Sequence, residues 1–549
     1  MAKPLRHTQE MIEEFVSKGY WDCISIADEL EKFAKIYPSK EALIDSEKRL
    51  SWSQLNQLSN SLALGFLQSG FEKDDVVIIQ IPSSVWTITF MMAFQKTGII
   101  YAISPITLRH REMSHIIKKL KAKGLIIYTE YRNFNFFKMA KELQSKLPSL
   151  KYIFTINDEK IEGAIPFKEI LLTPSEDQPL SPFLPDRRYG PFEVSTVVFS
   201  SGTTGLPKCI EYLNAALKAS GKGIIKKARL THEDTFGIIA PLSGGPGLHS
   251  AWAGLQIGAK IVLQERFDPE QTARLIQEEK ISFLSTIPTQ IIRILKEVNL
   301  KRYDLHSLRA IRTGGAAFDS SLAIETEEKF GCKVLLAGGS QETSTFAHTD
   351  IDDPPDVRLK TLGKVFPGNE LKIVDNLGNE LTQGEIGELY VRGAPTCSGY
   401  YHDITVTKKA WGCLGPEGWF KTGDFAKLDT SGNLILVGRK KEMILRGGQN
   451  IFPREIEELL MSHLKVKTVA VVGIPDSIMG ERVCACVIPK QGENFSFEEM
   501  VIFLKGKGLA VHKLPERLEI MENFPNLAEG QKIDKKLLIE KIIKRWSMG

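Results

Sequence analysis

Apolar residues in the first four hundred positions form short runs of strand length that alternate with stretches of helical spacing. Residues 74–82 (DDVVIIQIP) and 124–129 (GLIIYT) are apolar runs typical of buried strands. Between them, residues 112–120 (EMSHIIKKL) place their apolar side chains at helical spacing. This alternation predicts an α/β fold in which parallel sheets are covered by helices on both faces.

The pattern changes near residue 370, where strand-like segments with tight turns replace the alternation. Residues 427–439 (KLDTSGNLILVGR) are typical of a β-hairpin. A helix is then predicted over residues 453–464 and a strand over residues 468–475. We therefore expect a domain boundary near residue 440, followed by a compact α+β domain.

The composition excludes several classes of protein. A net charge of +4 over 549 residues is too small to predict a nucleic-acid partner. The most apolar stretch, residues 85–106, contains charged and helix-breaking residues, so it predicts a buried helix and a strand rather than a membrane span. No apolar signal region opens the chain, and seven scattered cysteines indicate neither a disulfide framework nor a zinc site. We expect a cytoplasmic protein without stable membrane insertion, and the sequence leaves a homodimer open.

Residues 199–208 (FSSGTTGLPK) are too polar and too rich in glycine to pack a core. They follow a strand predicted over residues 193–199, so their N–H groups, hydroxyls and one ammonium should converge at a strand end. These groups are the parts of a phosphate cradle, contributed by Ser200, Ser201, Gly202, Thr203, Thr204, Gly205 and Lys208. On pattern alone, the alternative interpretation is a flexible surface loop.

The stretch does not match the Walker A phosphate loop. That motif requires G-x-x-x-x-G-K-[ST], whereas here the two glycines are closer together and Lys208 is followed by Cys209. The sequence therefore disfavours a P-loop kinase.

Other polar, glycine-rich motifs occur at fixed places along the chain: TGGAAF (313–318), GGSQETS (338–344), GWFKTGD (418–424), GRKKEMILRGGQNIFPREIEE (438–458) and EGQKIDKK (529–536). With the 199–208 loop, they resemble the adenylate-forming (ANL) superfamily of acyl-CoA synthetases, aryl-acid ligases, luciferases and peptide-synthetase adenylation domains. The resemblance covers essentially the whole chain, and the order of the motifs is more specific than any one of them.

The resemblance implies a fold and a reaction. The expected N-terminal domain, residues 1–438, has two αβ sheets and a small β-barrel-like subdomain. A small mobile α+β domain, residues 439–549, is expected to rotate about a hinge near Lys441. In this family a small-molecule carboxylic acid attacks the α-phosphorus of ATP, pyrophosphate leaves, and a thiol such as that of coenzyme A displaces AMP. Because a carboxylate and a triphosphate repel each other, such a site must supply cations and N–H donors.

The resemblance also assigns catalytic roles. Glu342 is expected to bind Mg²⁺, and Lys532 to bridge the acid carboxylate and the α-phosphate. Lys208 and its loop are expected to hold the leaving phosphates, and Asp424 to accept the ribose hydroxyls. Further contacts to ATP or AMP are expected from Gly314, Gly315, Ala316, Gly338, Gly339, Ser340, Gln341 and Arg439. The expected thiol-side loop is Arg446, Gly447, Gly448 and Gln449.

Several of these assignments have a structural alternative. Gly314 to Ala316 could form only a tight turn, Glu342 could be a surface carboxylate, and Asp424 could cap a turn. Arg439 could simply make a surface ion pair, and Lys441 could be one more exposed lysine.

The sequence departs from the family pattern at several positions. Gly338 stands where an aromatic ring normally stacks on adenine, Gln341 replaces a threonine, and Gln531 separates a glycine from Lys532. Gly244 stands where a histidine or aromatic residue often borders the acid pocket. We hypothesise that Gly244, Gly245, Gly338 and Gly339 leave an acyl pocket open to a bulky or ring-bearing acid. The alternative is that other side chains fill this space.

An AMP-forming acid–CoA ligase is the leading interpretation. A second is an aryl-acid adenylating enzyme that loads a separate carrier protein. A third is a weakly catalytic nucleotide or acyl-adenylate binding protein, suggested by the altered motifs at 338–341 and 530–532.

Overall fold

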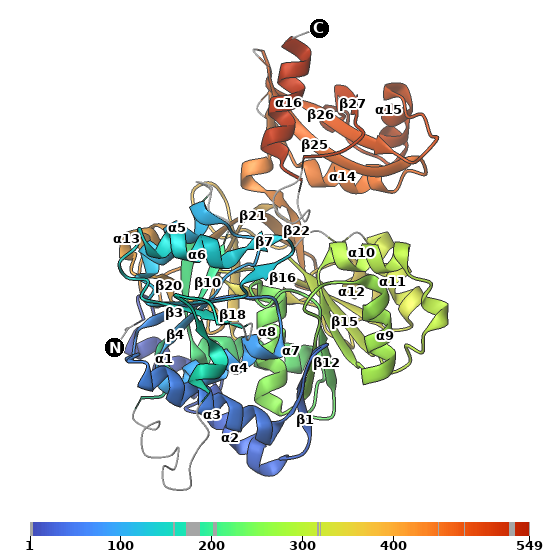
Figure 1. Cartoon of the computed structure of the whole chain (residues 1–549). Coiled ribbons are helices and arrows are strands. Elements are labelled where there is room, and N and C mark those ends of the chain that lie inside the picture. The colour runs from blue at the N-terminus through green and yellow to red at the C-terminus, as the bar shows by residue number, and fades with distance from the viewer. Residues whose placement is uncertain are drawn as a thin grey trace. The chain divides into compact units, whose positions relative to one another are not determined.

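The structure is a computed structural model that describes residues 4–156, 160–171, 187–200, 206–315, 318, 320–447, 449–476, 478–525 and 533–547 (Figure 1). By their internal contacts the residues fall into two compact units. Unit 1 comprises residues 1–318, 324–371 and 391–420, and unit 2 comprises residues 319–323, 372–390 and 421–549. The predicted division between residues 438 and 439 stays a prediction.

Unit 1 contains two eight-stranded sheets. In sheet A the strands from β16 to β1 are parallel, with β17 and β2 as antiparallel edges. The order of sheet A is β17 (Ser344–His348), β16 (Lys333–Ser340), β15 (Ala310–Gly314), β14 (Phe283–Thr286), β12 (Thr235–Ile238), β13 (Lys260–Leu263), β1 (Glu41–Ile44) and β2 (Arg49–Ser51).

Sheet B is parallel from β10 to β9 and antiparallel at β11 and β20. Its order is β20 (Gly399–Tyr400), β11 (Lys208–Leu213), β10 (Val194–Ser200), β4 (Ile100–Ile103), β3 (Val76–Gln80), β5 (Gly124–Ile127), β8 (Tyr152–Thr155) and β9 (Ile165–Pro166). A separate hairpin pairs β6 (Glu130–Tyr131) with β7 (Phe134–Asn135).

Helices alternate with these strands, as the hydrophobic pattern predicted. They are α1 (Gln9–Ser17), α2 (Ile26–Ile36), α3 (Trp52–Gln68), α4 (Val85–Thr97), α5 (His110–Leu120), α6 (Phe136–Gln144), α7 (Asn214–Ala228), α8 (Gly245–Ile257), α9 (Pro269–Glu279), α10 (Pro288–Glu297), α11 (Ser320–Phe330), α12 (Pro355–Lys360) and α13 (Ile404–Trp411). Helices α7 and α8 pack against each other in the middle of unit 1 (Figure 1).

The apolar stretch of residues 85–106 is largely buried inside the protein, where it forms helix α4 and strand β4. Every residue of α4 is buried, Ser84 caps its N-terminus, and Gly98 ends it in the left-handed conformation at φ +73°. The buried strand β4 follows directly. In the described part of the chain, no helix is long and apolar enough to cross a bilayer.

Two smaller sheets follow in the chain. A four-stranded sheet, most of whose residues belong to unit 2, has the order β18 (Asn369–Val374), β19 (Gly387–Gly393), β21 (Phe420–Leu428) and β22 (Leu434–Arg439). A five-stranded sheet has the order β24 (Gln449–Ile451), β23 (Ile444–Arg446), β26 (Gly480–Pro489) and β25 (Val466–Asp476), and β27 (Arg517–Ile520) pairs with β26. Its helices are α14 (Pro453–Met461), α15 (Phe497–Gly506) and α16 (Lys535–Ser547).

Two of the glycine-rich motifs lie largely in strands. Within the 338–344 motif, β16 continues through Ser340 and turns directly into β17. The 418–424 motif enters the first strand of the hairpin, Phe420–Leu428. In both cases glycine-rich sequence suggests a loop, whereas backbone pairing with the neighbouring strand extends the sheet.

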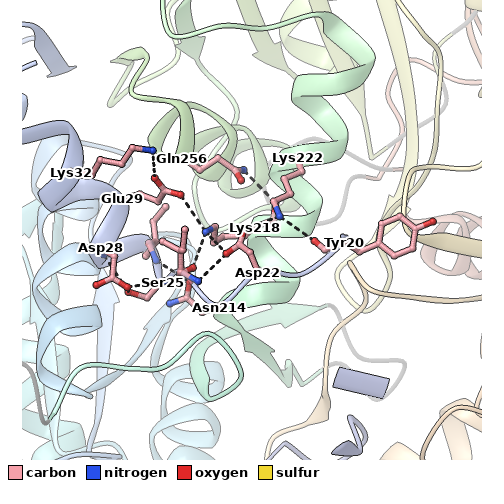
Figure 2. A network of polar contacts seen from close by, with 12 residues as sticks. Tyr20, Asp22, Ser25, Asp28, Glu29, Lys32, Asn214, Lys218, Lys222 and Gln256 are labelled. Carbon is pink, nitrogen blue, oxygen red and sulfur yellow. Dashed lines mark hydrogen bonds and ion pairs between the residues drawn. The ribbon is translucent and has the colours of Figure 1, made fainter. Parts of the chain in front are cut away.

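The N-terminal segment of unit 1 is held to α7 by a buried cation (Figure 2). Lys218 Nζ lies 2.8 Å from Asp22 Oδ1 and 3.4 Å from Glu29 Oε1, and it donates to the Ile24 carbonyl at 2.7 Å. One turn later, Lys222 Nζ lies 2.7 Å from Asp22 Oδ2. The two lysines differ in burial, since the Lys218 side chain is 3% exposed and that of Lys222 is 37% exposed.

We predict that Lys218→Met lowers the free energy of unfolding of unit 1 by about 3 kcal/mol, because it removes the buried cation shared by Asp22 and Glu29 and leaves Glu29 only the exposed Lys32, at 3.5 Å. Lys222→Met, the matched control on the same helix, should cost less than about 1 kcal/mol because its ion pair is solvated. Denaturant unfolding of both variants measures the difference. Equal losses of stability would show that burial of the Lys218 contacts does not matter.

Candidate functional site

Glu342 is the centre of a polar cluster that joins the two sheets of unit 1. It lies in the turn between β16 and β17 of sheet A, and only 8% of the residue is exposed. Its Oε1 accepts hydrogen bonds from Ser200 Oγ and from Tyr400 OH, each at 3.1 Å. Ser200 ends β10 and Tyr400 ends β20, so both donors come from sheet B.

Lys208 extends this cluster from the start of β11. Its Nζ lies 3.4 Å from the hydroxyl of Tyr400 and 4.8 Å from the centroid of the tyrosine ring. The ring face therefore interacts favourably with the ammonium. The structure thus brings together three predicted residues, Ser200, Lys208 and Glu342, and adds Tyr400.

Backbone contacts fix the turn that carries Glu342. The Glu342 N–H donates to Ser340 Oγ at 3.2 Å, and the Cys397 N–H donates to the Glu342 carbonyl at 3.0 Å. Tyr212 OH donates to the Gln341 carbonyl at 2.8 Å. Because these bonds come from β11 and from the segment before β20, the carboxylate is positioned by sheet B as well as by its own hairpin.

Tyr400 and Tyr212 are the residues that the sequence analysis missed. Burial, and then the Glu342 carboxylate, raise the pKa of Tyr400 far above its ordinary value. The phenol therefore stays protonated and remains a donor at neutral pH. The only local signal is a tyrosine directly after Gly399 in an apolar strand, which is equally typical of a core residue.

The donor set fits a magnesium–triphosphate group. Magnesium commonly takes one or two carboxylates together with phosphate oxygens, and Glu342 supplies one carboxylate. Ser200 and Lys208 can supply a hydroxyl and an ammonium for the phosphates. Among the described residues there is no group of three or more His, Cys, Asp or Glu side chains that could hold a metal by itself.

Several predicted residues lie outside the described part of the chain. These are Ser201, Gly202, Thr203, Thr204, Gly205, Ala316, Gly448 and Lys532. Their assigned roles stay predictions.

Gly314 and Gly315, expected beside adenine, lie where β15 ends. A Cβ on Gly314 would stand 2.4 Å from the Ala337 carbonyl oxygen, and Gly315 adopts φ +86°. Both positions therefore require glycine for the backbone itself. Their contact with adenine stays a prediction.

The glycines of the expected acyl pocket fall into two groups. A Cβ on Gly339 would lie 2.2 Å from the Ser344 carbonyl oxygen, and one on Gly338 would lie 2.5 Å from Leu362 Cδ1. Backbone and side chains already fill those spaces, so the expectation of open volume is wrong at 338 and 339. At Gly244 and Gly245 a Cβ would meet no atom closer than 3.4 Å, so each leaves room for a methyl group.

Asp424 and Arg439 belong to unit 2, where they are register partners on β21 and β22. Arg439 Nε lies 2.7 Å from Asp424 Oδ1, and Asp424 is buried. Arg439 therefore forms an ion pair, but its partner Asp424 is a buried carboxylate rather than a surface one. The role of either residue toward ribose stays a prediction.

The expected hinge and thiol-side loop also lie in unit 2. Lys441 is exposed in a single 3-10 turn, Lys440–Glu442. Arg446 forms a two-point ion pair with Glu516 at 2.8 Å and 2.8 Å, and Gly447 turns the chain at φ +54°. Gln449 begins β24 and is exposed. Hinge rotation and thiol contact stay predictions.

Comparison with known proteins places this geometry in a family. The AMP-binding enzyme family matches residues 30–401, and the AMP-binding enzyme C-terminal domain matches residues 455–531. The chain belongs to the AMP-binding enzyme family. This AMP-binding enzyme is therefore an adenylate-forming ligase of the AMP-forming acid–thiol type. Such enzymes use ATP, typically with Mg²⁺, and act on small-molecule acids.

Similar proteins include both kinds of acid ligase. The medium-chain fatty-acid–CoA ligase of Escherichia coli (strain K12) is 30% identical over 548 residues, covering 99% of this chain and 95% of that protein. The 2,3-dihydroxybenzoate-AMP ligase of Bacillus subtilis (strain 168) is 28% identical over 543 residues, covering 98% of each. The fold is shared with the anthranilate CoA ligase AuaEII in complex with anthranoyl-AMP, with a TM-score of 0.85 at 23% identity over 96% of this chain and 98% of that one.

We predict that Tyr400→Phe lowers the rate of acid-dependent ATP–pyrophosphate exchange about tenfold, because it removes one hydrogen bond to the charged Glu342. The matched control is Tyr189→Phe, since Tyr189 is also buried and its hydroxyl donates to Asp74 Oδ1 at 3.3 Å. The control should retain wild-type exchange within about twofold. A wild-type rate of exchange in Tyr400→Phe would show that the Tyr400 hydroxyl does not contribute to the site.

Proposed function

We propose that this AMP-binding enzyme activates a carboxylic acid with ATP and transfers the acyl group to coenzyme A. In the first half-reaction, Glu342 would hold Mg²⁺, which would neutralise phosphate charge, while Lys208 and the 199–208 loop bind the departing pyrophosphate. Asp424 receives the ribose, and Lys532 bridges the acid carboxylate and the α-phosphate. These roles rest on the motifs and on the convergence of Ser200, Lys208, Tyr400 and Glu342.

An arginine-lined cleft in unit 1 is the observation that favours coenzyme A as the thiol. The cleft has a volume of about 620 Å³ and is lined by Arg132, Asn133, Arg266, Phe267, Asp268 and Arg293. It lies between the β6–β7 turn, the loop after β13 and helix α10. Three arginines against one aspartate make it a cationic surface that suits a ligand with several phosphates.

The arginines of the cleft are not equivalent. Arg293 is held by Glu297 through two contacts of 2.7 Å, whereas Arg132 and Arg266 form no ion pair with any described residue. Both are exposed. Arg132 also interacts electrostatically with the nearby Glu265 carboxylate. Both guanidinium groups reach solvent and can contact a phosphorylated ligand, and coenzyme A carries three phosphate groups.

The relatives support a second candidate. A 2,3-dihydroxybenzoate-AMP ligase is nearly as similar to this chain as a fatty-acid–CoA ligase is. An aryl-acid adenylating enzyme that loads a carrier protein is therefore the alternative to coenzyme A. A carrier presents one phosphate on its pantetheine arm, so it would use the cleft less than coenzyme A does.

Thiols of graded charge test the proposal. We predict that Arg132→Ala and Arg266→Ala each raise the KM for coenzyme A about tenfold, because each removes a charge-assisted phosphate contact. The KM for pantetheine, which has no phosphate, should not change, and neither should pyrophosphate exchange. Arg302→Ala, an exposed arginine outside the cleft, is the control.

Three outcomes would contradict the proposal. If neither substitution changes the KM for coenzyme A, the cleft does not bind coenzyme A. Acyl transfer only to a carrier protein would favour the alternative. Absence of exchange with every acid of a broad panel would favour a nucleotide-binding protein without ligase activity.

A further inference from the structure

We propose that the acid which this enzyme activates carries a hydroxyl group, bound by Gln341, His249 and Arg312 beneath the β16–β17 turn. This inference rests on the proposed function and names the class of acid. All three residues contact or belong to residues 341–345, the turn that also carries Glu342. Each has a buried polar atom without a partner among the described residues.

Gln341 comes directly before Glu342 and borders the space left at Gly245. Its Nε2 donates to the Ser243 carbonyl at 3.3 Å, whereas its Oε1 is buried and has no described partner. A Cβ on Gly245 would lie 3.8 Å from that oxygen and 3.5 Å from His249 Cε1. Glycine at 245 therefore leaves room between a free acceptor and the histidine ring.

His249 lies on α8 and is 2% exposed. Its Nδ1 lies 3.4 Å from Ser344 Oγ, and its Nε2 has no described partner. Burial, and then the charge of Arg312, lower the pKa of His249 to about 3, so the ring is neutral. Because Ser344 Oγ can donate to Nδ1 or accept from it, Nε2 can serve as donor or acceptor.

Arg312 faces the same helix from sheet A. Its register neighbour on β14 is Ser285, whose hydroxyl donates to the Pro246 carbonyl of α8 at 2.9 Å. Adjacent residues of parallel strands share a face, so Arg312 also points toward α8. The guanidinium donates to His348 Nε2 at 3.2 Å and to Thr345 Oγ1 at 2.8 Å, and Nη1 has no described partner.

Arg312 is also a buried charge without an acidic side chain as its partner among the described residues. It is 2% exposed, and no ion pair joins it to any described residue. Burial alone lowers its pKa to about 10, which leaves it charged at neutral pH. Buried charges are costly without hydrogen-bond partners, so a ligand group that accepts from Nη1 would be bound favourably.

The mixture of free donors and acceptors selects the ligand group. Arg312 Nη1 can only donate, Gln341 Oε1 can only accept, and His249 Nε2 can do either. A carboxylate only accepts, and a hydrocarbon chain does neither. A hydroxyl both donates and accepts, so it is the simplest substituent that suits this set. Sites built to bind a hydroxyl also reject the analogue that lacks it.

Matched pairs of acids test the inference. Acid-dependent ATP–pyrophosphate exchange is measured for benzoate against its three monohydroxy derivatives, and for hexanoate against 6-hydroxyhexanoate and adipate. We expect the best hydroxy acid to exceed its parent at least tenfold in kcat/KM, and 6-hydroxyhexanoate to exceed adipate. The ratio of two acids on one preparation does not depend on the fraction of folded enzyme.

Gln341→Met and Arg312→Met should each reduce that ratio to about threefold or less. Gln80→Met is the matched control, because Gln80 is a fully buried glutamine in sheet B whose Oε1 also has no described partner. It should keep the wild-type ratio. Exchange with parent acids but no hydroxyl preference, or a ratio unchanged in both variants, would show that the cluster binds only water. Exchange with no acid at all would overturn the proposed function as well.

Discussion

The hydrogen-bonded carboxylate of Glu342 is the interaction on which the site depends. It is held by a hairpin of sheet A and receives two hydroxyl donors from sheet B. A carboxylate that is buried and bonded in this way has a fixed position, so a metal ion that it binds has a fixed position too. The ammonium of Lys208 contacts the same Tyr400 hydroxyl that donates to Glu342, so this phenol links the cation to the carboxylate.

Unit 1 buries several charged side chains, and their surroundings differ. Lys218 is surrounded by two carboxylates and a carbonyl, and these contacts offset the cost of burying its charge. Arg312 has only neutral partners and one nitrogen left over. The first arrangement is typical of a contact that holds two segments together. The second is typical of a group whose remaining partner is a ligand or water.

Much of the fold could be predicted from hydrophobic spacing, because buried parallel strands and their covering helices have distinct periods. The strand and helix at 74–82 and 112–120 are β3 and α5, and the buried run from residue 85 is α4 followed by β4. The family resemblance predicted that Ser200, Lys208 and Glu342 act on one magnesium–triphosphate group, and the structure brings these three side chains together around Tyr400. The prediction of open volume from glycine residues was wrong at Gly338 and Gly339, because neighbouring backbone and side-chain atoms lie too close there for a Cβ atom.

The partners of Glu342 could not be predicted in the same way. Tyr400 and Tyr212 are ordinary aromatic residues of apolar strands, and only pairing between segments far apart in sequence brings their hydroxyls to the turn. The cluster of Gln341, His249 and Arg312 is equally non-local. Its members come from a turn, a helix and a central strand, and no spacing in the sequence relates them.

Calorimetric binding of ATP with and without Mg²⁺, in wild type and in Glu342→Gln, tests the central claim most directly. If Glu342 holds the metal, Mg²⁺ should tighten ATP binding at least about tenfold in wild type and have little effect in Glu342→Gln, which keeps the shape of the side chain but not its charge. An equal effect of Mg²⁺ in both proteins would contradict the account.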